Sequence, residues 1–246
     1  MSDFTFNGIS AASLGLGIER YPEIPMPRKR ITSESVPGRS GDLHISDGSC
    51  DNVTIRYEVW WKNRNKNFPT GRSAREITTW LYSAPVGARL EDTYDSSVFR
   101  TATFVGGANI EDVMGRFGRM TLEFNCSPQK WLKSGETALT HKTPGGIIRN
   151  PTAYETKPLI RIVGSVGGLI KIGESYMVLR FPGTETHEFW MDCEEMEAWE
   201  VVDGQEVPSN AWIDSYAFLR IAPGANVIDF PQTWESVTVW GRFFEL

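Results

Sequence analysis

The chain has 246 residues, of which 40% are hydrophobic and 12% aromatic, a formal net charge of −6, and three cysteines. A globular chain of this length forms one large β domain or two ordinary domains with sizeable cores. No segment approaches the roughly 18 consecutive apolar residues of a membrane span, and the N-terminal MSDFTFNGIS lacks the basic and apolar regions of a secretory signal. We therefore expect no membrane partner and a protein made and kept in a reducing cytosol.

Charge is divided unevenly along the chain. Residues 1–133 carry 17 Lys and Arg against 15 Asp and Glu, whereas residues 134–246 carry 8 against 16. Nucleic acids attract proteins through Lys and Arg, so the acidic second half is a poor nucleic-acid binder. Two basic runs in the first half, at residues 28–30 and 62–67, lack interleaved aromatic residues. We interpret them as solvated loops and expect no sequence-specific nucleic-acid partner.

The first predicted element in chain order is a weak strand over residues 14–21, and it is followed by SVPGRSGDLH at 35–44. A phosphate-binding loop would need a helix directly after its glycines and a Gly-Lys-Ser/Thr ending. Here residues 42–45 lead instead into a second turn-rich cluster, SDGSCDN. We therefore interpret SVPGRSGDLH as a bend between strands, in which Gly38 and Gly41 adopt positive φ.

Two strongly alternating segments follow in the first half. VTIRYEVWW at 53–61 places Val, Ile, Tyr, Val and Trp on one face and Thr, Arg and Glu on the other, and RMTLEFNC at 119–126 repeats the pattern. This period of two predicts strands with one buried face. Weaker strands are predicted at 89–94 and 98–105.

One helix is predicted between these strands. SARE at 73–76 has the capping-box pattern, with Ser73 at the N-cap. Apolar residues at helical spacing over 74–81 form a stripe that would lie against the sheet. Pro85 then ends the helix.

Residues 134–149 lose strand alternation and are rich in Gly, Pro, Thr and Ser. We therefore predict a linker there, between a first domain of residues 1–133 and a second of residues 150–246. After Pro158 short alternating strands resume, separated by turns such as GSVGG and VDGQE. Several short strands without a second helix predict a β-sandwich or jelly roll, and the whole chain is predicted to be mainly β.

The sequence contains no recognisable motif for catalysis, cofactor binding or metal binding. GRSG at 38–41 is too short for a Gly-x-Ser-x-Gly elbow, and GLGIER has Arg20 where a dinucleotide fingerprint has its third glycine. The histidines form no zinc-binding pair, and the cysteines, which form no Cys-x-x-Cys, are predicted to be buried small hydrophobes. The histidines are His44, His141 and His187, and the cysteines are Cys50, Cys126 and Cys193.

Two features of the second half leave alternative functions open. The acidic run at 192–206 offers Asp192, Glu194 and Glu197 as carboxylates for glycoside hydrolysis, or oxygen ligands for calcium. The run lacks calcium-loop spacing and alternates with apolar residues, which favours a solvated strand and turn. Large aromatic residues usually fill the core, but exposed tryptophans would form a sugar-binding platform. The candidates are Trp190, Trp199, Trp212, Trp234 and Trp240.

Seven motifs carry a family resemblance. They are, in order, FTFNGIS, LGLGIERYPEIPMPRKR, VPGRSGDL, NPTAYETKPLIRIVGS, FWMDCEEMEAW, APGANVIDF and VTVWGRFFEL. In this order, with one helix after the third motif, the chain resembles the distal tail proteins of bacteriophages that have long, non-contractile tails. The resemblance spans nearly the whole chain.

This resemblance implies a fold and a structural role. Members have an N-terminal tail-tube-like β domain with one flanking α-helix and a C-terminal galectin-like β-sandwich, and six copies form a ring that joins the tail tube to the tip. The implied partners are further copies of this chain, the tail tube protein, the tail-associated tip protein, the tape measure protein and, in some phages, a receptor-binding protein. The implied location is the tail tip of the virion, after assembly in the host cytoplasm, and the role is not enzymatic.

A ring needs contacts between neighbouring copies, and SVPGRSGDLH is suited to one. Pro37 stiffens the entry to the turn, and Arg39 and Asp42 offer opposite charges to a neighbour, with Leu43 beside them. We therefore hypothesise that Arg39, Asp42 and Leu43 lie at the subunit interface. An internal turn with exposed charges is the alternative, and a carbohydrate-binding protein that contacts the host cell surface is the rival to the hub role.

Overall fold

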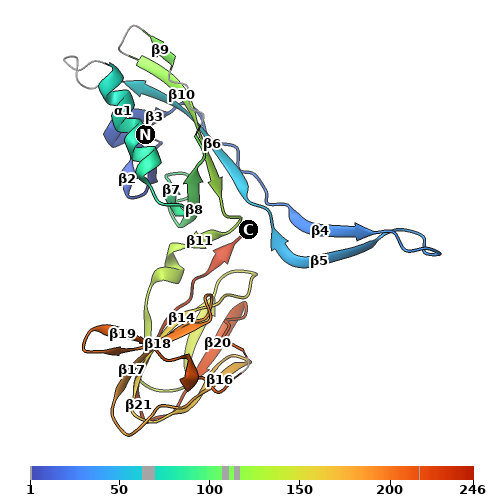
Figure 1. Cartoon of the computed structure of the whole chain (residues 1–246), viewed down its shortest axis with the longest axis vertical. Helices are drawn as coiled ribbons and strands as arrows, with labels where there is room; N and C mark the ends of the chain where they lie inside the picture. The colour runs from blue at the N-terminus through green and yellow to red at the C-terminus, as the bar shows by residue number, and fades with distance from the viewer. Residues whose placement is uncertain (1, 63–69, 107–110, 114–116, 216) are drawn as a thin grey trace. The chain divides into compact units, whose positions relative to one another are not determined.

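The structure is a computed structural model that describes residues 2–62, 70–106, 111–113, 117–215 and 217–246. The chain divides into two compact units, the first formed by Met1–Lys130 with Leu246 and the second by Trp131–Glu245. Strands dominate both units (Figure 1). The predicted mainly β class is therefore confirmed.

The described part of the first unit contains an antiparallel sheet with strands of different lengths, one α-helix and one 3-10 helix. Neighbouring strands follow the order β2-β1-β7-β8-β10-β6-β3, and β9 pairs with β10. The elements are β1 (Phe4–Phe6), β2 (Ile9–Ser10), the 3-10 helix η1 (Ala11–Leu14), β3 (Leu16–Ile18), β6 (Val53–Lys62), α1 (Thr70–Ser83), β7 (Ala88–Asp92), β8 (Val98–Phe104), β9 (Glu111–Val113) and β10 (Phe117–Cys126).

The two strands with the strongest alternation in the sequence pair with each other. Tyr57 of β6 lies opposite Leu122 of β10, and Ile55 lies opposite Phe124. This register brings the buried residues of both strands onto one face, and the Phe4 ring stacks on Tyr57 with centroids 4.4 Å apart. The core of the first unit therefore forms on the face that the period of two predicted.

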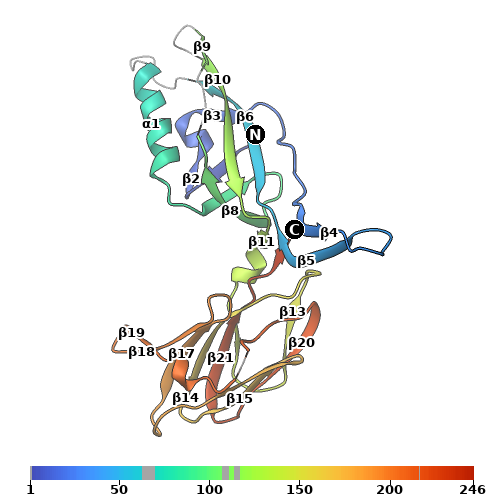
Figure 2. The same ribbon diagram turned by 45° about the vertical axis from the view of Figure 1, so that its right-hand side comes forward.

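Helix α1 covers this core (Figure 2). Ile77, Trp80 and Leu81 are buried, as the apolar stripe predicted, and Trp80 Nε1 donates a hydrogen bond to the Phe6 carbonyl oxygen at 3.0 Å. The helix begins at Thr70, so the prediction of Ser73 as N-cap is wrong. The SARE pattern indicates the start of the helix only weakly, because Ala, Arg and Glu are also favourable in the interior of a helix.

The second unit is a β-sandwich, as predicted. Its larger sheet has the strand order β12-β21-β14-β17-β18-β19 and its smaller sheet the order β13-β20-β15-β16. The elements of these two sheets and their connections are η2 (Lys133–Glu136), β12 (Leu139–His141), β13 (Gly146–Asn150), β14 (Leu159–Gly164), β15 (Gly168–Ile172), β16 (Ser175–Leu179), β17 (His187–Asp192), β18 (Glu197–Val202), β19 (Gln205–Pro208), η3 (Asn210–Trp212), β20 (Gly224–Asp229) and β21 (Trp234–Trp240). Two further strands, β11 (Lys130–Leu132) and β22 (Phe244–Glu245), pair with each other and belong to neither sheet of the sandwich.

Residues 134–149, which we expected to form a linker, contribute secondary structure to this second unit. They include most of η2, all of β12 and most of β13, and the division between the units falls at Lys130–Trp131. Both strands are short and lie at sheet edges. An edge strand of three to five residues carries too little alternation to be recognised in the sequence.

Candidate functional site

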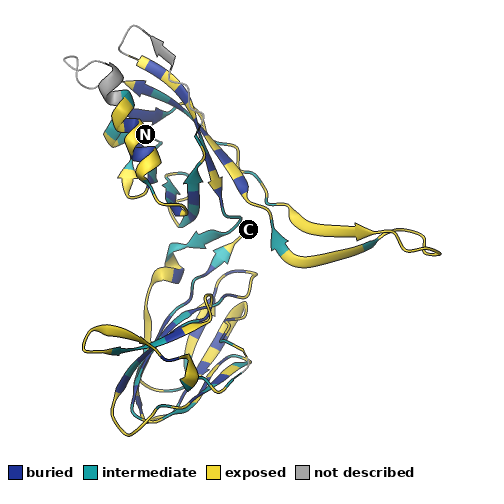
Figure 3. Cartoon of the chain, in the orientation of Figure 1, coloured by how far each residue is buried: buried dark blue, intermediate teal, exposed yellow. Residues whose placement is uncertain are grey.

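A two-stranded hairpin extends from the first unit without a core of its own. β4 (Lys29–Glu34) pairs antiparallel with β5 (Leu43–Cys50). All six residues of β4 and most residues of β5 are exposed, as Figure 3 shows. An isolated hairpin of two strands is at best marginally stable in water, so this one would gain stability from a covering surface.

Strand β5 corrects our interpretation of SDGSCDN as a turn-rich cluster. Residues 46–50 belong to the strand, and Ile31 of β4 lies opposite Ser46. Backbone hydrogen bonds hold this pairing, but neither strand buries a face, so the sequence contains no apolar alternation. Ile31 and Ile45 remain 53% and 49% exposed.

SVPGRSGDLH forms the bend between these strands, as predicted. Gly38 and Gly41 have φ values of 83° and 87°, in the region that favours glycine. Arg39 and Asp42 are exposed, and Leu43 is half-buried at the start of β5. The three residues of the interface hypothesis therefore lie together at the hairpin tip, and their contact with another subunit stays a prediction.

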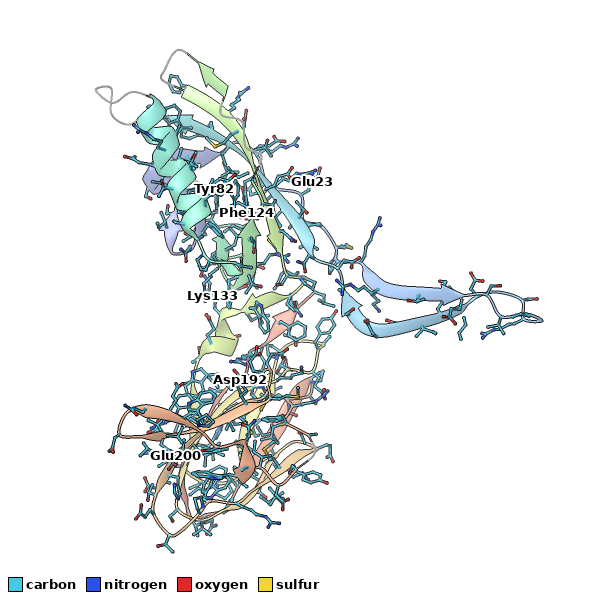
Figure 4. The ribbon with its side chains drawn as sticks, viewed as in Figure 1. Glu23, Tyr82, Phe124, Lys133, Asp192 and Glu200 are labelled. Carbon is cyan, nitrogen blue, oxygen red and sulfur yellow. The ribbon has the colours of Figure 1, made fainter. Side chains whose placement is uncertain are left out.

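A cavity of about 360 Å³ lies beside the segment that leads into the hairpin. We call this cavity the Arg100 pocket and residues 21–24 the strap. The strap forms one wall, with Glu23 on it (Figure 4), and the Tyr21 ring lies 4.2 Å from the Tyr94 ring. Other walls come from β6, β7 and β8, through residues that include Tyr57, Leu90, Phe99 and Arg100.

Arg100 is a buried cation on an inner wall of this pocket. Its residue is 9% exposed, and its Nη1 atom has no hydrogen-bond partner among the described residues. Burial lowers the pKa of Arg100 from its ordinary value, because a charged group loses its hydration there. A buried donor without an acceptor carries a free-energy cost, which an incoming acceptor would relieve.

Asp92, the carboxylate near this guanidinium, has other partners. It accepts hydrogen bonds from the Tyr57 hydroxyl at 3.1 Å and from the backbone N–H groups of Tyr94 and Asp95 at 3.0 and 3.2 Å. In the part of the chain that the structure describes, no carboxylate lies within 4.0 Å of Arg100 to form a salt bridge. The pocket therefore has a lining of mixed polarity, which includes Lys130 as well as acidic and apolar residues, and a buried arginine that forms no salt bridge within the described residues.

The acidic run of the second unit is committed to local structure. Asp192 at the end of β17 lies 2.6 Å from both Nη1 and Nη2 of Arg242 and accepts the Glu194 backbone N–H at 2.9 Å (Figure 4). Burial alone would raise the pKa of Asp192, but the Arg242 guanidinium lowers it overall. Glycoside hydrolysis needs a carboxyl group with a raised pKa as general acid, so Asp192 does not fit that role.

The other two candidate carboxylates are also poorly placed for this chemistry. Glu194 forms an ion pair with Lys157 at 3.4 Å. Glu197 begins β18 and is exposed. Both side chains are exposed to solvent, whereas the general acid of a glycosidase lies in a desolvated environment.

The five candidate tryptophans divide between the core and one outer face. Trp234 is 2% exposed and Trp212 packs against the core, so neither is a platform. Trp190, Trp199 and Trp240 are half-buried and stack in a row, with Trp190 centroids 6.2 Å from Trp199 and 5.3 Å from Trp240. Stacking on both sides covers the two ring faces of Trp190, the middle residue of the row, so Trp190 is not a sugar platform.

The cysteines match their predicted role only in part. Cys126 and Cys193 are buried, and burial raises the pKa of each thiol to about 12, which makes both unreactive. Cys50 is half-exposed at the end of β5, so its prediction as a buried residue is wrong. It lies on the hairpin, which has no core in which to bury it.

The histidines lie apart in the fold. His44 bonds Ser33 across the hairpin at 2.8 Å, whereas His187 places Nδ1 2.6 Å from Glu200 Oε1 and Nε2 2.8 Å from the Pro182 carbonyl. Within the described ranges, no group of three or more His, Cys, Asp or Glu residues is arranged to hold a metal ion. In the same ranges, no helix is long and apolar enough to cross a membrane.

Comparison with solved structures identifies the fold. The chain superimposes on the SPP1 Dit (gp 19.1) protein, described as a paradigm of the hub adsorption apparatus in phages that infect Gram-positive bacteria, with a TM-score of 0.77. The match covers 100% of both chains at 14% sequence identity. The chain has the SPP1 Dit fold. The resemblance to phage distal tail proteins is therefore confirmed at the level of the fold.

Two structures of the phage P2 baseplate in its activated conformation, one with Ca and one with Sr, share this Dit fold more distantly. Their TM-scores are 0.54 and 0.53, at 7% identity, and 97% of each chain is covered. No protein-family model and no curated protein sequence matches the chain. The fold is thus recognised through tertiary structure and not through overall sequence identity.

The Arg100 pocket is the feature of this Dit fold that our sequence reasoning missed. Residues 98–105 were predicted as a weak strand, and β8 buries Arg100 and Ala102 on the same face. Arg100 and Ala102 are two positions apart in a predicted strand, so they lie on the same face, and a buried Ala102 would have predicted a buried Arg100. The alternation of polar and apolar residues in VFRTATF is too weak to show which face of the strand is buried, and the neighbouring strands are needed to decide it.

Proposed function

We propose that this protein is a structural hub of a phage tail tip or baseplate, without enzymatic activity. In this role it forms a homo-hexameric ring and joins the tail tube protein to the tail-associated tip protein. The tape measure protein and, in some phages, a receptor-binding protein are further partners. The match to SPP1 Dit over the whole of both chains supports this proposal.

The single observation that carries the proposal is the unsupported hairpin. Its strands are almost wholly exposed in the single chain, although two strands without a core are marginally stable in water. A neighbouring copy in a ring would cover this surface, and each contact would recur at every interface. Arg39, Asp42 and Leu43 at the tip are the residues that we place in that contact.

Size measurement of the purified chain tests the ring. We expect native mass spectrometry to give a hexamer and electron micrographs to show a ring with a central hole. Arg39→Glu should shift the ring toward smaller species while circular dichroism and melting temperature stay near wild type, because the Arg39 side chain lies outside both cores. Loss of about 1 kcal/mol per contact accumulates around a closed ring.

Arg149→Glu is the matched control, because Arg149 is an exposed arginine of β13 in the second unit and distant in sequence from the hairpin. It makes the same charge reversal and should leave the ring intact. Arg39→Lys, which keeps the positive charge, should retain most of the assembly. A chain that remains a single subunit at high concentration would refute the ring.

A further inference from the structure

We propose that the Arg100 pocket of one copy receives the hairpin tip of a neighbouring copy, with the Asp42 carboxylate bound by Arg100. The inference rests on the proposed ring, which it deepens by assigning the receiving site. The Arg39 side chain of the incoming tip then lies at the acidic rim of the pocket, near Glu23 and Asp95. The evidence is the chemistry of the pocket together with that of the tip.

The pocket is built for an acceptor that comes from outside the subunit. Arg100 Nη1 is enclosed and has no hydrogen-bond partner among the described residues, and Asp92 is already bonded to Tyr57, Tyr94 and Asp95. A guanidinium presents a planar set of donors that matches a carboxylate. A carboxylate is therefore the ligand group that the inner end of the pocket selects.

The hairpin tip carries charges complementary to those of the pocket. Asp42 has no hydrogen bond or ion pair among the described residues, whereas Asp47 accepts from Ser49 and Asp51 pairs with Arg30. Asp42 is therefore an acid of the hairpin that is available to Arg100. Leu43, the next residue, would pack against apolar residues of the pocket lining, such as Leu90 and Phe99.

The rim of the pocket complements the second charge of the tip. Glu23 of the strap and Asp95 are both exposed and both line the cavity. These carboxylates would attract Arg39, which lies three positions before Asp42. Opposite charges in a fixed order define the register of docking as well as its strength.

The occupant has to be a second copy because the hairpin extends away from the core that carries the pocket (Figure 1). The six residues of β4 alone span roughly 20 Å when extended. A ring, in which every copy has a neighbour, provides the pocket that the tip needs.

A peptide binding experiment tests the pocket separately from the ring. The receptor is the full chain carrying Asp42→Asn, whose own tip lacks the carboxylate that Arg100 binds, and the probe is a fluorescent cyclic peptide of residues 33–44. We expect saturable binding by fluorescence anisotropy, weakened at least about tenfold by Asp42→Asn in the peptide or Arg100→Met in the receptor, since each removes a charge-assisted hydrogen bond.

The controls of this experiment use other charges of the same elements. Glu34→Gln in the peptide removes the acid on the neighbouring strand and should change affinity by less than about twofold. Glu23→Arg in the receptor should lower the affinity for the wild-type peptide and restore the affinity for the peptide carrying Arg39→Glu. Because Glu23 is exposed, this swap tests the pocket even if Arg100→Met disturbs folding. Equal affinity for all peptides and receptors overturns the inference.

Cross-linking of the full chain links the pocket to the ring. In a Cys50→Ser background, Glu23→Cys together with Arg39→Cys, which keeps the proposed contact between Asp42 and Arg100, should give a ladder of disulfide-linked subunits under oxidation. Val86→Cys with Arg39→Cys is the control, because Val86 is exposed and does not line the pocket. A ring without the ladder and without peptide binding overturns the pocket inference and leaves the hub proposal standing. Peptide binding to a chain that never assembles supports the pocket and overturns the ring.

Discussion

Replacing Arg100 by methionine should stabilise the isolated protein, although it should impair docking. The substitution removes a buried donor that has no partner among the described residues, and such a group costs about 1–3 kcal/mol. Part of this gain is offset by loss of the attraction between the Arg100 guanidinium and the Asp92 carboxylate. Asp92 keeps its hydrogen bonds from Tyr57, Tyr94 and Asp95.

We therefore expect a net gain of about 1 kcal/mol, since methionine retains most of the apolar stem of arginine. For a unit of this size that gain raises the melting temperature by about 4 °C. Differential scanning calorimetry of the unassembled chain measures it. Arg119→Met is the matched control, because Arg119 is exposed, pairs with Glu19 at 2.9 Å, and should change stability by less than about 0.5 kcal/mol. A fall of several degrees for Arg100→Met would refute the assignment of an unsatisfied cation.

Two further predictions concern the hairpin and the second unit. Limited trypsin digestion should cut the unassembled chain early at Arg39, and not first within residues 134–149, because the tip is exposed whereas those residues form strands; mass spectrometry of the first fragments checks this, and the ring should be protected at Arg39. Burial alone would lower the pKa of His187, but its hydrogen bond to Glu200 raises it overall, so protonated His187 stabilises the second unit below about pH 6.5. This stabilisation should be lost as pH rises through the raised pKa, and urea unfolding from pH 5.5 to 8.5 should show less pH dependence in His187→Gln; equal slopes for both proteins would contradict it.

The sequence by itself determined those parts of the fold that bury one face. Alternation in residues 53–61 and 119–126 predicted β6 and β10, and the apolar stripe predicted the buried face of α1, because a buried face imposes its period on the residues that form it. The order of turn and strand motifs also led to the phage distal tail fold. Each of these patterns lies within a short stretch of residues, so it can be recognised in a single sequence.

Only the tertiary structure decided the features that depend on residues far apart in the chain. Strand β5 has no buried face, so its sequence shows no alternation of apolar and polar residues. Only its pairing with β4 in the structure identifies it as a strand. Trp234 and Trp190 have the same side chain, but the sandwich buries one in the core and stacks the other on its outer face. In the sequence Arg100 is one charged residue in a weakly predicted strand, and only the packing of β6 and β7 around it shows that it is buried. Burial and the lack of an acceptor are properties of the whole packed environment, and no short stretch of sequence encodes them.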